Sequence, residues 1–471
     1  MMDATATENT NHIISKYFFI SVSAIEVMFL MWRYLIVPTR NSVTFFSTFI
    51  ILLILSLPLG VGLVLNIFRG KHVSFVFTFG LCAGYGFLAG ICALMLRVGF
   101  PLSPNLYIGI ILLIAGYLIY RKWGELKILF NQSSHQQSLA ELLAPLTVLL
   151  FAFIVLSFTW TNSYVPTDVD CQSDSYNTLM ILKEGSYPTV SPFLDQTQLQ
   201  LNSGPIFHTL TAFIVKLKNS SLIDETMSVT IVSGAFFCLA MYFLASFIVK
   251  SEIILFLTGI LVLTRAYISY VNDGNLPESM AYYFAVLFIV FLFYTLEHKR
   301  PIIATIAGAC LSCCMFSHPM IFLYNFPAFG LFFISFFISE NKNIKKDYVN
   351  LLIIGAALIS VIPYMLRLRG DDHTAGTVYV NDATTLIRCL PYWNGYIVPI
   401  LSLVGGGILA TKRKAVNIYL WTYFLMVLAF LEHWRLFQIF SPSWFELKAL
   451  ATPAFGAYYM YESAFMYPAN W

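Results

Sequence analysis

Charged side chains are scarce in this 471-residue sequence, at 11% of the total, whereas hydrophobic residues make up 58%. A soluble domain carries about 25% charged residues, and a chain with far fewer cannot keep its surface in water. The formal net charge of +3 is small, and the basic residues lie in separate short segments rather than along one stripe. These shortages exclude a soluble globular protein and leave no support for nucleic-acid binding.

What the sequence does contain is a succession of apolar segments, and its mean hydropathy is +0.75. Crossing a membrane as a helix takes about 20 apolar residues, and such segments recur from end to end. We therefore expect an all-α polytopic bundle of about fourteen transmembrane spans. The expected starts lie near residues 17, 43, 73, 104, 139, 226, 252, 278, 301, 319, 349, 395, 415 and 446.

The loops between these spans alternate in composition. Short basic loops such as EHKRP and TKRKA alternate with longer ones that hold most of the carboxylates and histidines. By the positive-inside rule, the basic loops and both termini are cytoplasmic, and the other set faces outside. Polar residues gathered at one end of many membrane helices are by default a functional-site hypothesis.

A linker of mixed polarity follows the fourth span and ends near residue 138. We expect it to separate a four-helix N-terminal membrane extension, 1–138, from the main membrane module, 139–471. The third span carries small residues at a spacing that lets helices pack closely in lipid. These residues are Gly80, Gly84, Gly86 and Gly90.

Cysteine is also scarce, with eight in the chain. Six of the eight lie inside apolar spans, where a thiol behaves as a small hydrophobic group. Cys171 and Cys389 fall in loops on the same predicted side. They are either two free thiols or, if that side is oxidising, a disulfide.

The long outer loop, 161–225, begins with an acidic cluster. Asp168, Asp170 and Asp174 lie within seven residues, just after a membrane helix. Crowded carboxylates can raise the pKa of one toward that of a general base, or form a divalent-cation site. The alternative is a solvated acidic turn.

Two short helices are expected in the same loop. The stretch DSYNTLMILKEG predicts a helix that ends at Gly185 as its C-cap. The stretch 204 to 218 is amphipathic, carries His208, and ends before Asn219 and Ser220. We expect both helices to lie at the membrane surface, over the outer end of the bundle.

These motifs resemble a known family. Asp170, Gly185 with Tyr187 and Pro188, and GPIFHTLTAF at 204 to 213 look like the first outer loop of the GT-C superfamily of polytopic glycosyltransferases. NDGNLPESMAYYFAVLF at 272 to 288 and SHPMIFLYNFPAF at 317 to 329 fit as well. The resemblance covers about residues 139 to 330.

The resemblance implies an inverting glycosyltransferase in a prokaryotic plasma membrane, with the endoplasmic reticulum as the alternative location. Its donor would be a polyprenyl-phosphate-linked sugar, used at the outer face, and its acceptor a glycan, a lipid or a protein. Asp170 is the expected general base, with Asp168 as the alternative and Asp174 third. Asp168 and Asp170 are also the expected ligands if Mg²⁺ or Mn²⁺ is required.

The donor phosphate calls for basic groups on the same side, because a guanidinium can clamp two phosphate oxygens. The candidates are Arg435, Arg367, Arg369 and Lys448. Arginines at helix ends can instead extend toward lipid headgroups. The expected substrate-binding residues are His208, His318, Asp273 and Glu278, and the alternative for the histidines is satisfaction by backbone carbonyls.

Two other classes of protein share these features. A multi-pass transporter or flippase of a lipid-linked or small polar substrate also has many spans, but usually carries ionisable groups near mid-membrane and repeats its architecture. Here the few charges within spans are Glu26, Arg33 and Arg265, and no inverted repeat is evident. A non-catalytic membrane subunit, with a merely solvated acidic loop, is the third alternative.

Overall fold

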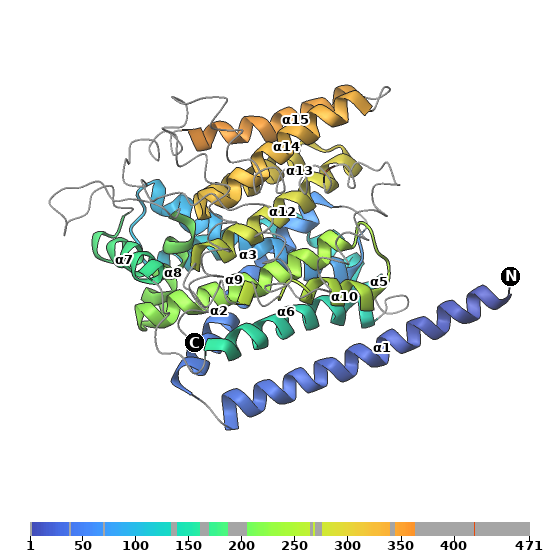
Figure 1. Cartoon of the computed structure of the whole chain (residues 1–471), viewed down its shortest axis with the longest axis horizontal. Helices are drawn as coiled ribbons and strands as arrows, with labels where there is room; N and C mark the ends of the chain where they lie inside the picture. Colours follow the sequence, from blue (N-terminus) through green and yellow to red (C-terminus); the bar gives the residue numbers. More distant parts are fainter. Residues whose placement is uncertain are drawn as a thin grey trace, which may run out of the picture.

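The chain is helical throughout the part that the computed structural model describes, and no strand occurs there (Figure 1). That part comprises residues 2–36, 39–68, 71–132, 139–160, 169–186, 205–263, 267–268, 276–339, 344–362 and 419. Its long helices run side by side, as a membrane bundle requires, because each helix satisfies its own backbone polar groups.

The helices in chain order are α1 (Met2–Met31), the π-helical turn η1 (Trp32–Ile36), α2 (Arg40–Ile67), α3 (Val73–Arg97), α4 (Pro104–Tyr120), α5 (Trp123–Gln132), α6 (Leu139–Trp160), α7 (Val169–Glu184), α8 (Pro205–Lys218), α9 (Leu222–Ala245), α10 (Glu252–Ile260), α12 (Leu276–His298), α13 (Pro301–Ser317), α14 (Pro319–Ser339), α15 (Ile344–Ala357) and the 3₁₀ turn η2 (Leu358–Val361). The first eleven expected span starts each fall in one of these helices. The last three, near 395, 415 and 446, lie outside the described residues.

The chain is a multi-pass membrane protein. Six of the described helices are long and apolar enough to cross a bilayer, and the pair α4 and α5, bent by 68°, would make a seventh span. The expected span near 252 is shorter than predicted, because α10 covers only nine residues. The count of fourteen spans stays a prediction.

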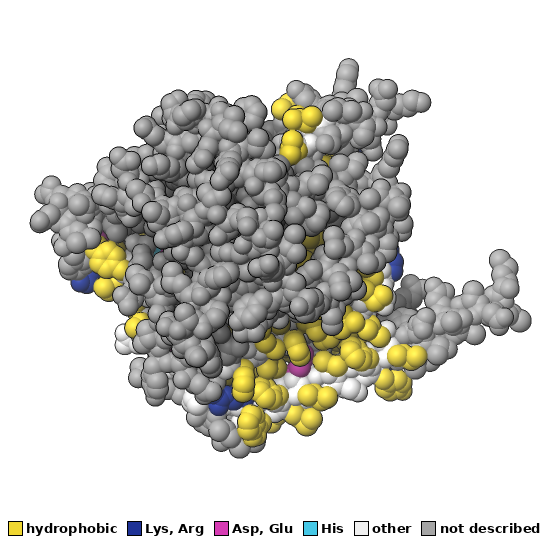
Figure 2. Space-filling view, viewed as in Figure 1, with side chains coloured by type: hydrophobic (Ala, Val, Ile, Leu, Met, Phe, Trp, Pro, Cys, Tyr) yellow, Lys and Arg dark blue, Asp and Glu magenta, His cyan; other side chains and the backbone are white. Residues whose placement is uncertain are grey.

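Hydrophobic side chains cover part of the surface over α1, α6 and α10 (Figure 2). On α1, for example, Ile25 and Met28 are 61% and 62% exposed. In water such a surface would drive aggregation, whereas in a bilayer it faces acyl chains of the same polarity. The surface therefore agrees with the membrane assignment.

The helices α2 and α3 cross in close contact, as the glycine spacing in the third span predicted. A Cβ atom added at Gly60 or Gly84 would overlap the backbone carbonyl of Gly80 or Ser56. Gly86 meets α12 instead, because its N–H donates to the hydroxyl of Tyr283 at 2.9 Å. The prediction of close packing is confirmed for this crossing, although Gly60 on the opposing helix was missed.

The N-terminal helices share their packing with later ones. The helix α1 packs on α6, and α2 and α3 pack on α9 and α8 respectively. Aromatic contacts join the two parts, since the rings of Phe49 and Phe153 are stacked with centroids 4.1 Å apart. Whether the chain divides near residue 138 stays a prediction.

The helices α7 and α8 lie at one end of the bundle, and α5 and the N-terminus lie at the other (Figure 1). At the α5 end, Lys127 sits over the ring of Trp123 at 5.7 Å, and Lys122 pairs with Glu125. The basic turn at α5, expected inside, and the helices of the loop expected outside thus occupy opposite ends of the bundle.

Candidate functional site

The helices of the outer loop end where the sequence predicted, although α7 begins at Val169, five residues before the predicted stretch. Gly185 adopts a left-handed conformation, with φ of 65°, and its N–H donates to the carbonyl of Ile181 at 2.9 Å, which ends α7. The helix α8 runs from Pro205 to Lys218, and Asn219, with φ of 50°, terminates it. Local turn chemistry therefore predicted both ends correctly.

The environment of α8 differs from the expected surface helix. All residues from Ile206 to Ile214 are buried, including the polar side chains of Thr209 and Thr211. The reason is that α3, α7, α9 and α13 all contact α8, so its polar face is covered as well as its apolar face. An amphipathic pattern shows which face is apolar, but not what covers the other face.

The structure brings Asp174 of α7 into contact with His208 of α8. The Nε2 atom of His208 lies 3.6 Å from Oδ1 of Asp174, and His208 is 0% exposed. The hydroxyl of Thr178 donates its single proton to the carbonyl of Asp174 at 3.0 Å, so it accepts from Nδ1–H of His208 at 3.1 Å. Both ring nitrogens of His208 therefore face protein groups.

The structure also brings together Glu278 and His318. Glu278 stands in the first turn of α12, and His318 follows the last residue of α13. The Nε2 atom of His318 lies 3.1 Å from Oε1 of Glu278, and their side chains are 15% and 7% exposed respectively. The start of α12 meets the end of α13 because the two helices are antiparallel neighbours. Since α12 also contacts α7 and α13 contacts α8, the pair lies at the same end of the bundle as α7 and α8.

Burial keeps both imidazoles neutral. It lowers the pKa of His208 to about 3 and that of His318 also to about 3, both from an ordinary 6.5. Each histidine faces a carboxyl group that would favour the protonated ring. Desolvation of the charged form outweighs that attraction, so neither contact is an ion pair. The contact of His318 with Glu278 has hydrogen-bonding geometry at 3.1 Å, whereas Nε2 of His208, with the ring proton on Nδ1, only approaches Asp174 at 3.6 Å.

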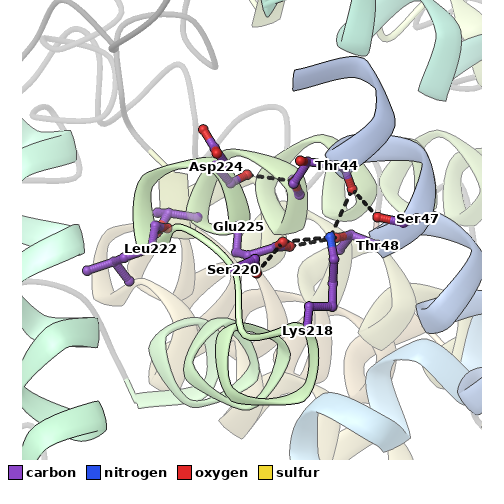
Figure 3. A network of polar contacts seen from close by, with 10 residues as sticks. Thr44, Ser47, Thr48, Lys218, Ser220, Leu222, Asp224 and Glu225 are labelled. Atoms are coloured by element: carbon purple, nitrogen blue, oxygen red, sulfur yellow. Dashed lines mark hydrogen bonds and ion pairs between the residues drawn. The ribbon is translucent and has the colours of Figure 1, made fainter. Parts of the chain in front are cut away.

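The end of α8 is anchored by a third polar cluster (Figure 3). The Nζ atom of Lys218 lies 2.6 Å from Oε1 of Glu225 on α9, which is 0% exposed. Lys218 also donates to the hydroxyl of Thr48 on α2 at 2.7 Å, and that hydroxyl donates to Glu225 Oε2 at 2.5 Å. Ser220 donates to the same carboxylate at 2.7 Å. This network fixes α8, and with it His208, against α2 and α9.

Sequence reasoning did not single out Thr178, Lys218 or Glu225. Thr178 follows Asp174 by one helical turn, so the spacing of polar residues along α7 could have identified it. Lys218 and Glu225 flank the break between two helices, and their pairing depends on how those helices turn back on each other. No local pattern in the sequence predicts that turn.

The other predicted site residues are described less fully. Asp170 lies in the first turn of α7, but its side chain is outside the described residues. The remaining predictions fall wholly outside them, namely Asp168, Asp273, Arg367, Arg369, Arg435 and Lys448, and so do Cys171's side chain and Cys389. Among the described residues no group of three or more His, Cys, Asp or Glu could hold a metal ion, which leaves the predicted site at Asp168 and Asp170 untested.

Comparison with known proteins adds no relative. No protein-family model, no curated protein and no solved structure matches this chain. The likeness to the GT-C superfamily therefore depends on the sequence motifs between residues 139 and 330 alone.

Proposed function

We propose that this chain is a membrane glycosyltransferase that moves a sugar from a polyprenyl-phosphate-linked donor to an acceptor hydroxyl at the outer membrane face. The acceptor is carried by a glycan, a lipid or a protein. Asp170 acts as the general base, and the arginines and Lys448 named above hold the donor phosphate.

The observation that carries the proposal is the contact between α7 and α8. The resemblance rests on an acidic motif and on a later aromatic-His motif, which are well separated in the sequence. In the structure, Asp174 from the first motif and His208 from the second lie against each other. Asp170 precedes Asp174 by four residues, so the two share one face of α7. Motifs that share a site are expected to meet in this way.

The reaction needs few groups. A carboxylate at Asp170 would take the proton of the acceptor hydroxyl while the oxygen attacks the anomeric carbon of the donor sugar. The bond from that carbon to the phosphate oxygen would break, and the polyprenyl phosphate would leave with the electron pair. A donor with an isoprenoid tail would reach such a site from the bilayer.

The experiment uses the purified chain in nanodiscs with a panel of radiolabelled polyprenyl-phosphate sugars. We expect Asp170→Asn to lower sugar transfer or hydrolysis by roughly 100-fold or more, as loss of a general base does. Glu184→Gln is the matched control, since it removes an exposed carboxylate at the far end of the same helix. Turnover that is equal in Asp170→Asn and wild type, or absent with every donor, contradicts the proposal.

Transport is a second candidate, which Glu26 favours. Glu26 stands in the apolar stretch Ile14–Tyr34 of the first span and is 4% exposed, and the described residues give neither carboxyl oxygen a hydrogen-bond partner. Ionisable groups inside membrane spans commonly mark substrate or proton pathways. If Glu26→Gln abolishes sugar-lipid flux across proteoliposomes while no donor sugar is ever released, transport replaces transfer as the function.

A further inference from the structure

His318 is held in a fixed position between two helices. It is the C-cap of α13, with an extended backbone at φ −151° and ψ 117°. Its N–H donates to the carbonyl of Cys314 at 2.9 Å, and its own carbonyl is approached by the N–H of Phe322 in α14. The backbone of His318 is thus fixed by both neighbouring helices, so its ring is presented from a rigid support.

The contact with Glu278 decides which ring nitrogen carries the proton. A carboxylate only accepts hydrogen bonds, and 3.1 Å between Nε2 and Oε1 is a hydrogen-bonding distance. The proton of the neutral imidazole therefore sits on Nε2. The other nitrogen, Nδ1, is left with a lone pair and can only accept.

The Nδ1 atom of His318 is buried, and the described residues offer it no hydrogen-bond partner. A buried acceptor without a partner is costly, and native proteins have few of them. In His208, by contrast, Nδ1 donates to Thr178 at 3.1 Å and therefore has a partner within the chain. The difference points to a group from outside the chain that donates to His318.

The chemistry of this nitrogen restricts what that group can be. A lone pair does not bind a phosphate oxygen, which is itself an acceptor, but it does bind an O–H. A carboxylate that orients an imidazole, with the second nitrogen turned to a hydroxyl, is the arrangement by which proteins position and polarise hydroxyl groups. Sugars present such groups in number.

We propose that Glu278 and His318 form a hydroxyl-binding site in which Nδ1 of His318 accepts a hydrogen bond from a sugar ring. Glu278 is the positioning residue, because it orients the ring through Nε2. The proposed glycosyltransferase function makes the sugar the natural ligand, and the inference depends on that function only for this choice. In this proposal the neutral ring of His318 binds a hydroxyl group, whereas a protonated histidine would bind phosphate.

The test is ¹⁵N-histidine solid-state NMR of the full chain in nanodiscs, titrated with the methyl glycosides of glucose, galactose and mannose. We expect the Nδ1 resonance of His318 to shift on addition of at least one glycoside, while both resonances of His208 stay unchanged as an internal control. Disappearance of one pair of signals in His318→Gln assigns the resonances.

Two variants separate the nitrogens. The amide of Gln reaches the Nε2 position and keeps the contact with Glu278 but offers nothing at Nδ1, whereas the amide of Asn reaches the Nδ1 position. We expect His318→Gln to weaken glycoside binding about tenfold, and His318→Asn to weaken it about threefold or less, since one hydrogen bond is worth about tenfold in affinity. Thermal unfolding of each variant in detergent verifies that it folds.

The outcomes separate this inference from the proposed function. A glycoside-dependent shift at His318 in a protein without sugar transfer keeps the inference and overturns the proposed function. If sugar transfer depends on Asp170 but no glycoside shifts the Nδ1 resonance of His318, the inference is overturned. A signal at Nδ1 that already shows a hydrogen bond and never changes assigns the position to a bound water, which also overturns it.

Discussion

The two histidine–carboxylate pairs at the α7 end of the bundle are alike in composition but differ in how the ring is used. His208 is fully buried, and its two nitrogens face Thr178 and Asp174. His318 is 15% exposed, and only Nε2 faces a described partner. The comparison teaches that the number of engaged ring nitrogens, more than burial, separates a histidine that holds helices together from one that can hold a ligand.

The largest effect is expected from removing His208, whose two ring nitrogens both face protein groups. Replacing His208 with Leu leaves a carboxyl group and a hydroxyl buried without the ring, so we expect a loss of roughly 3 kcal/mol in stability. Thermal and SDS-induced unfolding in detergent measure it. The companion variant is His318→Gln, which we expect to lose less than about 1 kcal/mol. Equal losses in the two variants would remove the distinction between the pairs.

The next prediction concerns how the stability of the folded chain depends on pH. The pKa of His208 is lowered to about 3 in the folded chain, whereas the unfolded chain takes up that proton near 6.5. The unfolded state binds more protons between these values, so stability is complete above pH 6.5 and falls as pH decreases. Each of the two buried histidines, His208 and His318, is expected to contribute a slope of about 1.4 kcal/mol per pH unit. The loss should be visible between about pH 6.5 and 5 as a lower temperature of thermal unfolding.

The control for the titration is His208→Asn, which removes the titrating ring. We expect a flatter profile in this variant, with about half the slope of the wild type remaining, because His318 still titrates. A profile as steep as that of the wild type would show that other groups cause the pH dependence.

The smallest effect is expected from Thr178→Val. This change keeps the shape of the side chain but removes the group that accepts from His208, and we expect a loss of about 1 kcal/mol. Thr305→Val is the matched control, because the hydroxyl of Thr305 also bonds the carbonyl four residues before it, at 3.0 Å, but is exposed. The same unfolding assay applies, and an equal loss in both variants would deny Thr178 any part in holding the ring.

The sequence predicted those features that depend on local chemistry. Apolar stretches indicated the helices, and Gly185 and Asn219 marked helix ends because a left-handed residue ends a helix wherever it occurs. Asp174 and His208, both predicted for the outer loop, do meet, whereas the catalytic and substrate-binding roles expected for them stay predictions. The sequence could not show that α8 is buried from Ile206 to Ile214, nor that Lys218 pairs with Glu225, because both depend on neighbours contributed by distant segments.

The close crossing of α2 and α3 bears on how the chain assembles. The two helices are joined by a short connection between Ile67 and Val73, and their contact is made by backbone at Gly60 and Gly84. Such a hairpin contains its own packing surface, so it can close in the bilayer while the ribosome is still synthesising the segments that follow. The helices α8 and α9 would then dock on a preformed template. A single extra methyl group at Gly84 would therefore disturb this packing during biogenesis, before the functional site has formed.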